Sequence, residues 1–406
     1  MEGKRFVQTM QLQNILSYGS QSEEIRLEPL NVLIGPNASG KSNLIEALGL
    51  LRATPHDLTA PIREGGGVTE WLWKGKDNPT GKIDATIYYP ESAVSVPLRY
   101  RLEFSAVGQR FEIVDEAVEN AKSSNSFEPD VYFFYRYQRG RPILNVRTKP
   151  EEPQGYTERQ QRSLRREDLN PDQSVLSQRK DPDQYPELTY LSNQFSNIHL
   201  FREWNLGRYT PSRLPQKPDL PEDFLLEDAS NLGLVLNDLQ HRAGIRQLLV
   251  EKLGKFNDSI EDITTKIHGG TVQLFVHEKG LRQPIPATRL SDGTLRYLCL
   301  LTVLCHPAPP PLVCIEEPEL GLHPDILPTV AELLIEASQR TQLVVTTHSD
   351  VLVSALTHIP ESILVCERTA DGTQLRRLTT EQLKPWLEKY TLGELWRMGE
   401  LGGTRW

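Results

Sequence analysis

The sequence predicts an α/β protein whose core is split along the chain. Near the N-terminus, a short apolar run at 30–34 leads through a glycine-rich loop into a segment at 43–48 that reads as the start of a helix. Near the C-terminus, apolar runs at 312–315 and 342–346 alternate with helical patterns, which is typical of parallel strands. The long stretch between these two parts is therefore expected to be inserted into one core.

The composition sets limits on the class of protein. The 406 residues are 38% hydrophobic, which is enough for a large core with more than one lobe. The net charge is −9, whereas domains that bind nucleic acid are often basic overall. A basic patch on part of the surface remains compatible with this net charge. Four cysteines without a C-x-x-C pair suit buried thiols in a reducing cytosol. No apolar run approaches the ~18 residues of a membrane span, so we expect a cytoplasmic protein without a membrane partner.

Residues 1–80 are expected to form the N-terminal part of the core, with strands at 6–16 and 25–34. The loop that follows fits the pattern G-x-x-x-x-G-K-[ST] with Gly35, Pro36, Asn37, Ala38, Ser39, Gly40, Lys41 and Ser42. Such a loop, between a strand and a helix, points its backbone N–H groups at a phosphate. We expect Lys41 to reach the β- and γ-phosphates of a nucleoside triphosphate and Ser42 to hold Mg²⁺.

Residues 81–148 alternate between apolar and polar side chains and predict an antiparallel β lobe. The clearest strands are expected at 83–88, 98–104 and 131–137. Residues 149–285 begin with an exposed polar segment and continue, from 187 to 268, with what we expect to be mostly helices. Their clearest amphipathic pieces are 231–239 and 246–256.

Residues 286–406 form the expected C-terminal part of the core and carry paired acids after a buried strand. Glu316 and Glu317 directly follow the apolar run at 312–315, where carboxylates are costly unless they face a metal or water. Glu316 is placed to join a Mg²⁺ shell and Glu317 to polarise the attacking water. The alternative is an ordinary strand that leaves the core into solvent.

Two further motifs flank these acids. Ser291 and Gly293 precede an apolar helix expected at 295–304, so Ser291 either caps this helix or forms a second phosphate-binding helix end that acts on another subunit's nucleotide. His348 follows the strand at 342–346 and could touch the γ-phosphate, although a lone histidine is more often a surface residue. The order and spacing of all four motifs favour the functional interpretation.

With these motifs in order, the chain resembles the ABC-type ATPase superfamily, and within it the soluble SMC/RecF/OLD-like branch. The narrower resemblance lies in the segments 316–324 and 346–349 and in Asn43 directly after Lys41-Ser42. Segments 60–67, 173–178 and 392–396 further resemble a group of bacterial predicted ATPases without a Toprim nuclease domain. The resemblance implies a P-loop NTPase fold with an ABC-type head.

The resemblance also implies roles for matching residues. Two departures from the family pattern are Glu316, where many relatives have Asp, and Ser-Asp-Gly in place of Ser-Gly-Gly. By the resemblance, residues 35–42 are the Walker A loop, with Asn43 beside the nucleotide, and residues 312–317 are Walker B, with Glu317 as the catalytic glutamate. Residues 290–294 are the signature motif, with Ser291 and Gly293, and residues 319–324 are the D-loop. His348 is the switch histidine, and Gln178 is the Q-loop glutamine, a ligand of nucleotide and Mg²⁺.

The same resemblance implies a homodimer that closes around two ATP molecules and hydrolyses them, in DNA repair or phage defence. The segment after His348 is short for a nuclease domain, so an effector nuclease is expected to be a separate protein. Basic clusters at 136–141 and 159–180 leave DNA binding open, against the simpler interpretation of a solvated face. Two other classes stay open: a transporter's nucleotide-binding subunit and a nucleotide-dependent scaffold that does not hydrolyse ATP.

Overall fold

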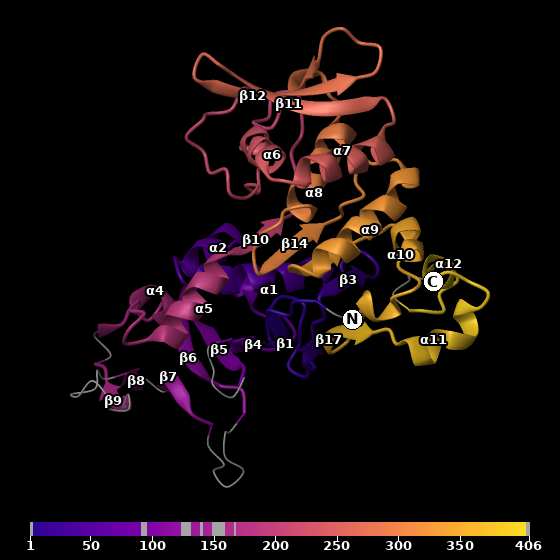
Figure 1. Cartoon of the computed structure of the whole chain (residues 1–406). Helices are drawn as coiled ribbons and strands as arrows, with labels where there is room; N and C mark the ends of the chain where they lie inside the picture. Colours follow the sequence, from indigo (N-terminus) through magenta and orange to yellow (C-terminus); the bar gives the residue numbers. More distant parts are fainter. Residues whose placement is uncertain are drawn as a thin grey trace, which may run out of the picture.

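The computed structural model describes residues 3–90, 96–122, 131–138, 141–147, 159–165 and 168–402 (Figure 1). Within these residues the strands form sheets of six, eight and three strands. In Figure 1 the six-stranded sheet occupies the middle of the molecule, the eight-stranded sheet lies below it, and the three-stranded sheet lies above. The middle sheet is the one that positions the site.

The six-stranded sheet is built from both ends of the chain. Five of its strands are parallel, and only the edge strand β17 runs antiparallel to its neighbour. Its order is β10 (Ile198–Phe201), β14 (Leu312–Glu316), β15 (Gln342–Thr346), β3 (Leu30–Ile34), β16 (Ile363–Thr369) and β17 (Gly372–Arg377). The predicted split core with parallel strands is confirmed.

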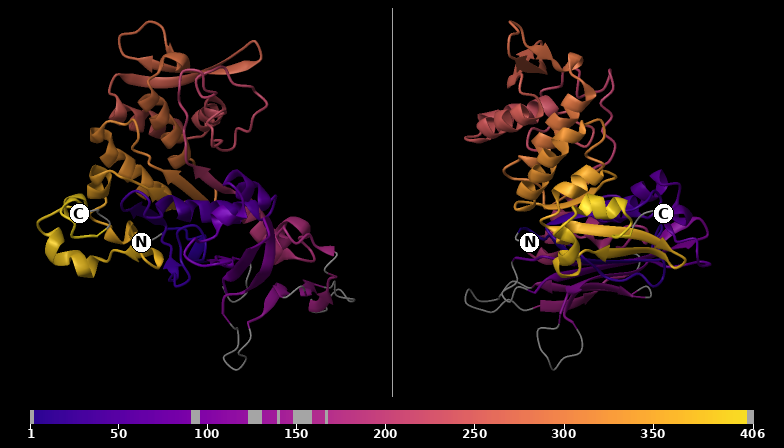
Figure 2. Two further views of the ribbon diagram at one scale, coloured as in Figure 1. Left: turned by 180° about the vertical axis from the view of Figure 1, so that it is seen from behind. Right: turned by 90° about the vertical axis from the view of Figure 1, so that its right-hand side faces the viewer.

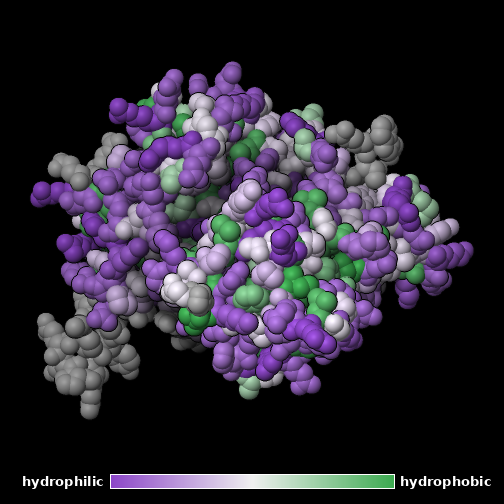
Figure 3. Space-filling view, turned by 90° about the horizontal axis from the view of Figure 1, so that it is seen from above, coloured by the Kyte–Doolittle hydropathy of each residue, from purple (hydrophilic) through white to green (hydrophobic). Residues whose placement is uncertain are grey.

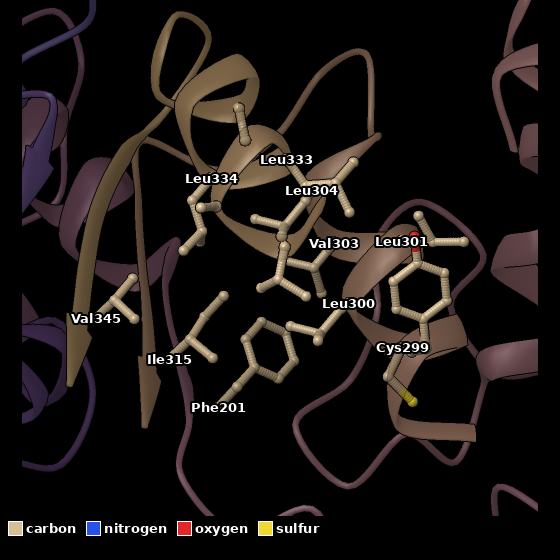
Figure 4. Close-up of a cluster of buried hydrophobic side chains, with 14 of the residues drawn as sticks. Phe201, Cys299, Leu300, Leu301, Val303, Leu304, Ile315, Leu333, Leu334 and Val345 are labelled. Atoms are coloured by element: carbon tan, nitrogen blue, oxygen red, sulfur yellow. The ribbon is translucent and has the colours of Figure 1, made fainter. Parts of the chain in front are cut away.

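Helices cover both faces of this sheet, because the strand side chains alternate between two apolar clusters. Val32 and Ile34 of β3 join the cluster that includes α8 (Asp292–Leu304) and α9 (Leu327–Ser338). Leu33 joins the cluster on the opposite face, which includes α1 (Lys41–Ala53). Figure 4 shows part of the first cluster, where Leu300 and Leu304 of α8, Phe201 of β10 and Ile315 of β14 gather in one apolar layer. Every residue of β3 and β15 is buried, as expected for strands between two helical layers.

The eight-stranded antiparallel sheet packs on the far side of α1 and shares its apolar cluster. Its order is β2 (Ile25–Arg26), β1 (Val7–Gln13), β4 (Gly81–Ile87), β5 (Leu98–Val107), β6 (Arg110–Asn120), β7 (Phe133–Gln138), β8 (Arg141–Arg147) and β9 (Arg159–Ser163). The predicted antiparallel strands are confirmed. The strand expected at 25–34 is instead two strands in different sheets, separated by a segment containing Pro29, which lacks a backbone donor.

The inserted segment is less helical than predicted. Helices α6 (Leu232–His241) and α7 (Ile245–Phe256) confirm the two amphipathic pieces. The expectation of mostly helices was wrong at β10 and at β11 (Ile260–His268), because β10 completes the parallel sheet and β11 pairs with the strand next along the chain. The other elements of the segment are α4 (Val175–Gln178), α5 (Pro186–Ser196), β12 (Thr271–Glu278) and β13 (Ile285–Pro286).

The remaining helices lie at the edges of the fold. Helices α2 (Thr59–Glu64) and α3 (Val68–Trp71) follow α1, and α10 (Asp350–Ala355), α11 (Thr380–Leu387) and α12 (Leu392–Arg397) gather near β17 at one side (Figure 2). Seen from the end that carries β11 and β12, the surface is mostly hydrophilic with scattered hydrophobic residues (Figure 3). No helix in the described ranges has the length and apolar content needed to cross a membrane.

Candidate functional site

The motif residues meet at the edge of the six-stranded sheet where its parallel strands end. The loop 35–40 follows β3, Glu317 follows β14, and His348 follows β15. A cavity of about 320 Å³ opens there. It is lined by Ser17, Asn37, Ala38, Gly40, Lys41, Ser42, Asn43, Glu317, Thr346, His348 and Arg368. Carboxyl ends of parallel strands are where open α/β sheets bind their ligands.

Glycine is required at two positions of the loop. Gly35 has φ 147°, and a Cβ there would lie 2.3 Å from the carbonyl oxygen of Cys366. Gly40 has φ 101°, and a Cβ there would lie 2.2 Å from Thr373 Oγ1. Both positions therefore combine a left-handed backbone with close neighbours, and α1 begins at the next residue, Lys41. The sequence pattern G-x-x-x-x-G-K-[ST] thus has a local steric basis.

Hydroxyl and amide side chains fix the loop from outside. Asn43 Nδ2 donates to Ser17 Oγ at 2.7 Å. Thr373 Oγ1 lies 2.7 Å from Ser17 Oγ and 2.8 Å from the carbonyl oxygen of Ser39. Thr373 thus connects the loop to Ser17, and Ser17 is connected to the first turn of α1 through Asn43. Ser17 was not among the predicted residues.

Lys41 is buried at the floor of the cavity. Its Nζ donates to the carbonyl oxygens of Gly35 at 2.8 Å and Pro36 at 3.0 Å. Burial lowers the pKa of Lys41, while nearby acids, including Glu317, oppose this shift. The cation is thus held against the phosphate loop by neutral acceptors, which it can exchange for phosphate oxygens.

Glu317 and His348 face each other across the cavity. Glu317 has φ 46°, an uncommon conformation for a residue other than glycine that occurs often at functional sites. Its Oε1 lies 3.8 Å from His348 Nε2. Burial lowers the pKa of His348, and the charge of Lys41 lowers it further. A neutral histidine therefore stands beside the carboxylate at neutral pH.

Glu316 points toward an arginine that the sequence did not single out. Its Oε1 lies 3.6 Å from Nε of Arg202, the residue directly after β10, and Glu46 Oε1 lies 3.7 Å from Arg202 Nη1. Burial raises the pKa of Glu316, and the charge of Arg202 opposes this. Glu316 Oε1 is a buried acceptor that has this ion pair but no hydrogen-bond partner among the described atoms. Arg202 was missed because β10 was expected to be helical.

Glu319 organises the segment before His348. Its Oε1 accepts hydrogen bonds from Thr347 Oγ1 at 2.7 Å and from the backbone N–H of His348 at 2.7 Å. A carboxylate accepting two such bonds fixes the backbone from which the histidine projects. The sequence placed Glu319 in the D-loop and gave no signal for this contact.

Seven of the predicted site residues are not in the lining of the cavity: Gly35, Pro36, Ser39, Glu316, Gln178, Ser291 and Gly293. The expected Q-loop glutamine, Gln178, makes local hydrogen bonds: its Oε1 accepts from the backbone N–H of Asn170 at 2.7 Å and its Nε2 donates to the carbonyl oxygen of Gln173 at 2.8 Å. Its amide is thus committed to the turn around α4. Ser291 and Gly293 lie at the start of α8.

Ser291 caps α8, as one interpretation of the sequence expected. Its Oγ accepts from the backbone N–H of Thr294 at 3.0 Å. Gly293 packs against the D-loop segment, since a Cβ there would lie 2.7 Å from the carbonyl oxygen of Gly321. The capped helix end is exposed and touches the loop that follows the paired acids.

The donor set around the cavity suits Mg²⁺. No group of three or more His, Cys, Asp or Glu side chains gathers in the described residues as a metal cage would require. Mg²⁺ commonly binds through one or two protein oxygens, with waters and phosphates completing its shell. The hydroxyl of Ser42 lines the cavity and is an oxygen of that kind. Oε1 of Glu316, the residue before Glu317, is a second such oxygen; it lies outside the lining and is paired with Arg202 without a hydrogen bond.

Comparisons with known proteins show the family and the fold of the chain. Residues 30–354 match the family described as "AAA domain, putative AbiEii toxin, Type IV TA system". The chain belongs to this family of AAA-domain ATPases. No protein with a curated description matches the sequence.

Solved structures of SMC heads share the fold. An SMC head bound to the C-winged helix domain of ScpA is 14% identical, with a TM-score of 0.57 over 93% of this chain and 99% of that one. An SMC head with an extended coiled coil, bound to the C-terminal domain of ScpA derived from Pyrococcus furiosus, is 12% identical, with a TM-score of 0.57 over 95% of this chain and 99% of that one. The fold is therefore a P-loop NTPase with an ABC-type head.

The basic clusters are partly used within the chain. Arg136 pairs with Glu119 at 3.0 Å, Arg179 Nη2 donates to the carbonyl oxygen of Asp168 at 3.1 Å, and Lys180 Nζ donates to that of Pro55 at 2.9 Å. Arg139 and Arg166 lie outside the described residues. DNA binding stays a prediction.

Proposed function

We propose that this protein binds ATP with Mg²⁺ in the 320 Å³ cavity and hydrolyses it when two copies close around the nucleotide. One observation carries the proposal. Lys41, Ser42, Glu317 and His348, which follow three different strands, line a single cavity. Ser291 and Gly293, at the capped end of α8, do not line it. The cavity would thus supply one half of each site and α8 of a second copy the other half.

The cavity residues would divide the work of phosphoryl transfer. The loop N–H groups and the N-terminus of α1 would receive the phosphates, and Lys41 would exchange its carbonyl acceptors for phosphate oxygens. Glu317 would hold the attacking water, and neutral His348 would contact the γ-phosphate. Mg²⁺, held by Ser42 and Glu316, would offset the phosphate charge. Catalysis would rest on positioning and charge stabilisation.

The second copy would complete the site through α8. The N–H groups at a helix N-terminus attract anions, so this end would meet the γ-phosphate bound to the first copy. Loss of that phosphate on hydrolysis would remove the link between the copies and loosen the dimer. ATP binding and hydrolysis would thereby switch the assembly between two states.

The test is solution mass by light scattering for Glu317→Gln, with and without Mg²⁺-ATP. We expect a shift from monomer to dimer with ATP, and no shift for Lys41→Ala. Wild-type phosphate release should then depend on protein concentration. A monomer that hydrolyses ATP at full rate at every concentration would refute the dimer. Dimerisation without phosphate release by the wild type would instead support the non-hydrolysing scaffold.

The ATP-bound dimer and the released monomer would act differently on a separate effector protein in the cytoplasm. We propose that this effector is a nuclease that works in DNA repair or phage defence. The family description, which names a toxin, is compatible with a defence role. Proteins captured by Glu317→Gln with ATP should differ from those captured by Lys41→Ala. Capture of an integral membrane protein by the ATP-bound form would support a transporter subunit in its place.

A further inference from the structure

A buried arginine holds the segment that leads into α8. Arg213 lies in the connection between β10 and α6, and its side chain is almost entirely enclosed. Its Nε donates to the carbonyl oxygen of Leu206 at 2.8 Å, and its Nη1 donates to that of Ala287 at 3.3 Å. Nη1 also donates to the carbonyl oxygen of Leu290, directly before Ser291. The planar guanidinium thus ties the insert to the backbone that enters the helix.

The same guanidinium pairs with an acid inside the signature motif. Arg213 Nη2 donates to Oδ1 of Asp292, which lies between Ser291 and Gly293 in the first turn of α8. The Asp292 side chain is 72% exposed, whereas that of Arg213 is 6% exposed. A carboxylate is favourable at a helix N-terminus in a free molecule. It would, however, repel a phosphate approaching the same helix end, and a fixed cation beside it offsets that repulsion.

We propose that Arg213 is a positioning residue for the Ser291–Gly293 helix end, where it fixes the backbone and offsets the charge of Asp292. Through this contact the helix end can receive the terminal phosphate of a nucleotide bound by a second copy. The inference rests on the proposed function and deepens it. Arg213 does not line the cavity of its own chain, so its effect is exerted on the partner's nucleotide.

The first test is Arg213→Met in the full chain. Affinity for a fluorescent ATP analogue should stay at the wild-type level, because the cavity is intact. ATP-dependent dimerisation and kcat should fall about tenfold or more, as expected for lost hydrogen bonds from a charged group. Arg242→Met is the matched control, because it removes a half-buried arginine–aspartate pair of the same insert, with Asp238, that lies near His306 and so at the opposite end of α8 from Ser291. It should leave all three measurements unchanged.

The second test separates charge from folding. Adding Asp292→Asn to Arg213→Met removes the uncompensated carboxylate and should restore several-fold of the lost dimerisation. Arg213→Lys, which keeps the charge but loses the fork, should fall between wild type and Arg213→Met. A purely structural arginine would give no rescue by Asp292→Asn and a loss that follows the melting temperature alone. If Arg213→Met does not fold, the lysine variant with and without Asp292→Asn decides the question in the same way.

Mixed variants distinguish this inference from the proposed function. Lys41→Ala and Ser291→Arg, each inactive alone, should recover ATPase activity when mixed, because one site per mixed dimer keeps both intact halves. If they do not, the shared site itself is refuted. If they do, Lys41→Ala mixed with Arg213→Met should also recover activity. Failure of this second mixture, or full activity of Arg213→Met alone, overturns the role of Arg213 and leaves the shared site standing.

Discussion

The nucleotide cavity and the start of α8 are built in contrasting ways. The cavity loop is tied through the Ser39 carbonyl to Thr373, which also contacts Ser17, and Ser17 in turn accepts from Asn43 at the start of α1; the lysine that follows the loop is buried. The start of α8 is exposed, and its fixed contacts are a cap, a glycine against Gly321 and one arginine from the insert. The first region is organised to hold a ligand within the chain. The second presents a helix end outward, where another molecule can reach it.

The two regions therefore differ in how a contact elsewhere in the molecule can affect them. We expect the conformation of the phosphate loop to change little when a distant part of the molecule moves, because closely packed neighbours surround the loop. A helix end tied to an insert moves when the insert moves. Binding of a partner to the insert would therefore act on the α8 half first.

The largest effect is expected for Lys41→Ala in the cavity. Loss of the buried cation should abolish measurable ATP binding and lower phosphate release about 100-fold or more, as for removal of a charge-stabilising group. Calorimetric titration with ATP and a phosphate assay check this. Lys255→Ala, which removes an exposed lysine paired with Glu332 at 3.0 Å, is the control. Retained ATP affinity in Lys41→Ala would show that the cavity does not bind the phosphates.

The next effect is expected for Gly293→Ala at the start of α8. A methyl group there must displace the Gly321 carbonyl 2.7 Å away, and such overpacking costs about 1–3 kcal/mol. ATP affinity of the monomer should stay unchanged, while ATP-dependent dimerisation weakens about tenfold or more. Gly254→Ala, on α7 with nothing within 4 Å of the added Cβ, is the matched control. Equal loss of monomer affinity and dimerisation would contradict the separation of the two regions.

A smaller effect is expected for Glu319→Ala, because Glu319 acts through the segment that carries His348. Two hydrogen bonds to one carboxylate are lost, at Thr347 Oγ1 and His348 N. We expect kcat to fall about tenfold with little change in KM. Glu319→Gln keeps an acceptor oxygen and should retain more activity than Glu319→Ala. A rise in KM without a change in kcat would place Glu319 in nucleotide binding instead.

The sequence predicted the parallel sheet well, because its central strands are apolar runs buried on both faces. It failed at β10, which has four residues and includes His199. Burial lowers the pKa of His199 to about 4, yet a histidine in a sequence gives no sign that it is enclosed. Short strands are recognised only through their neighbours, and β10 lies beside β14, which is far along the chain.

The same limit applies to the site. The residues that the sequence located directly follow apolar strands, as Glu317 and His348 do. Gln178 lies in a polar segment where the spacing of residues does not predict a position in the fold. Its amide makes hydrogen bonds with the nearby backbone of Asn170 and Gln173. Arg368 and Arg213 were missed because their roles depend on contacts made across the fold. A local sequence pattern is enough to recognise the end of a strand. A contact between residues that are far apart in the sequence can be recognised only in the structure.

The smallest effect concerns pH and His348. Burial and the charge of Lys41 lower the pKa of His348, so the neutral form persists below the ordinary value of about 6.5. If neutral His348 contacts the γ-phosphate, kcat should be flat from about pH 8 to about pH 6.5 and fall only at lower pH. His348→Gln should lower kcat at neutral pH and remove the part of the acid fall that belongs to this group. A wild-type kcat that rises on acidification would mean that the protonated histidine is the active form. We expect the fall in kcat at low pH to come from catalysis and not from unfolding, because the His348 side chain is still 38% exposed and its lowered pKa weakens the fold only slightly as pH drops.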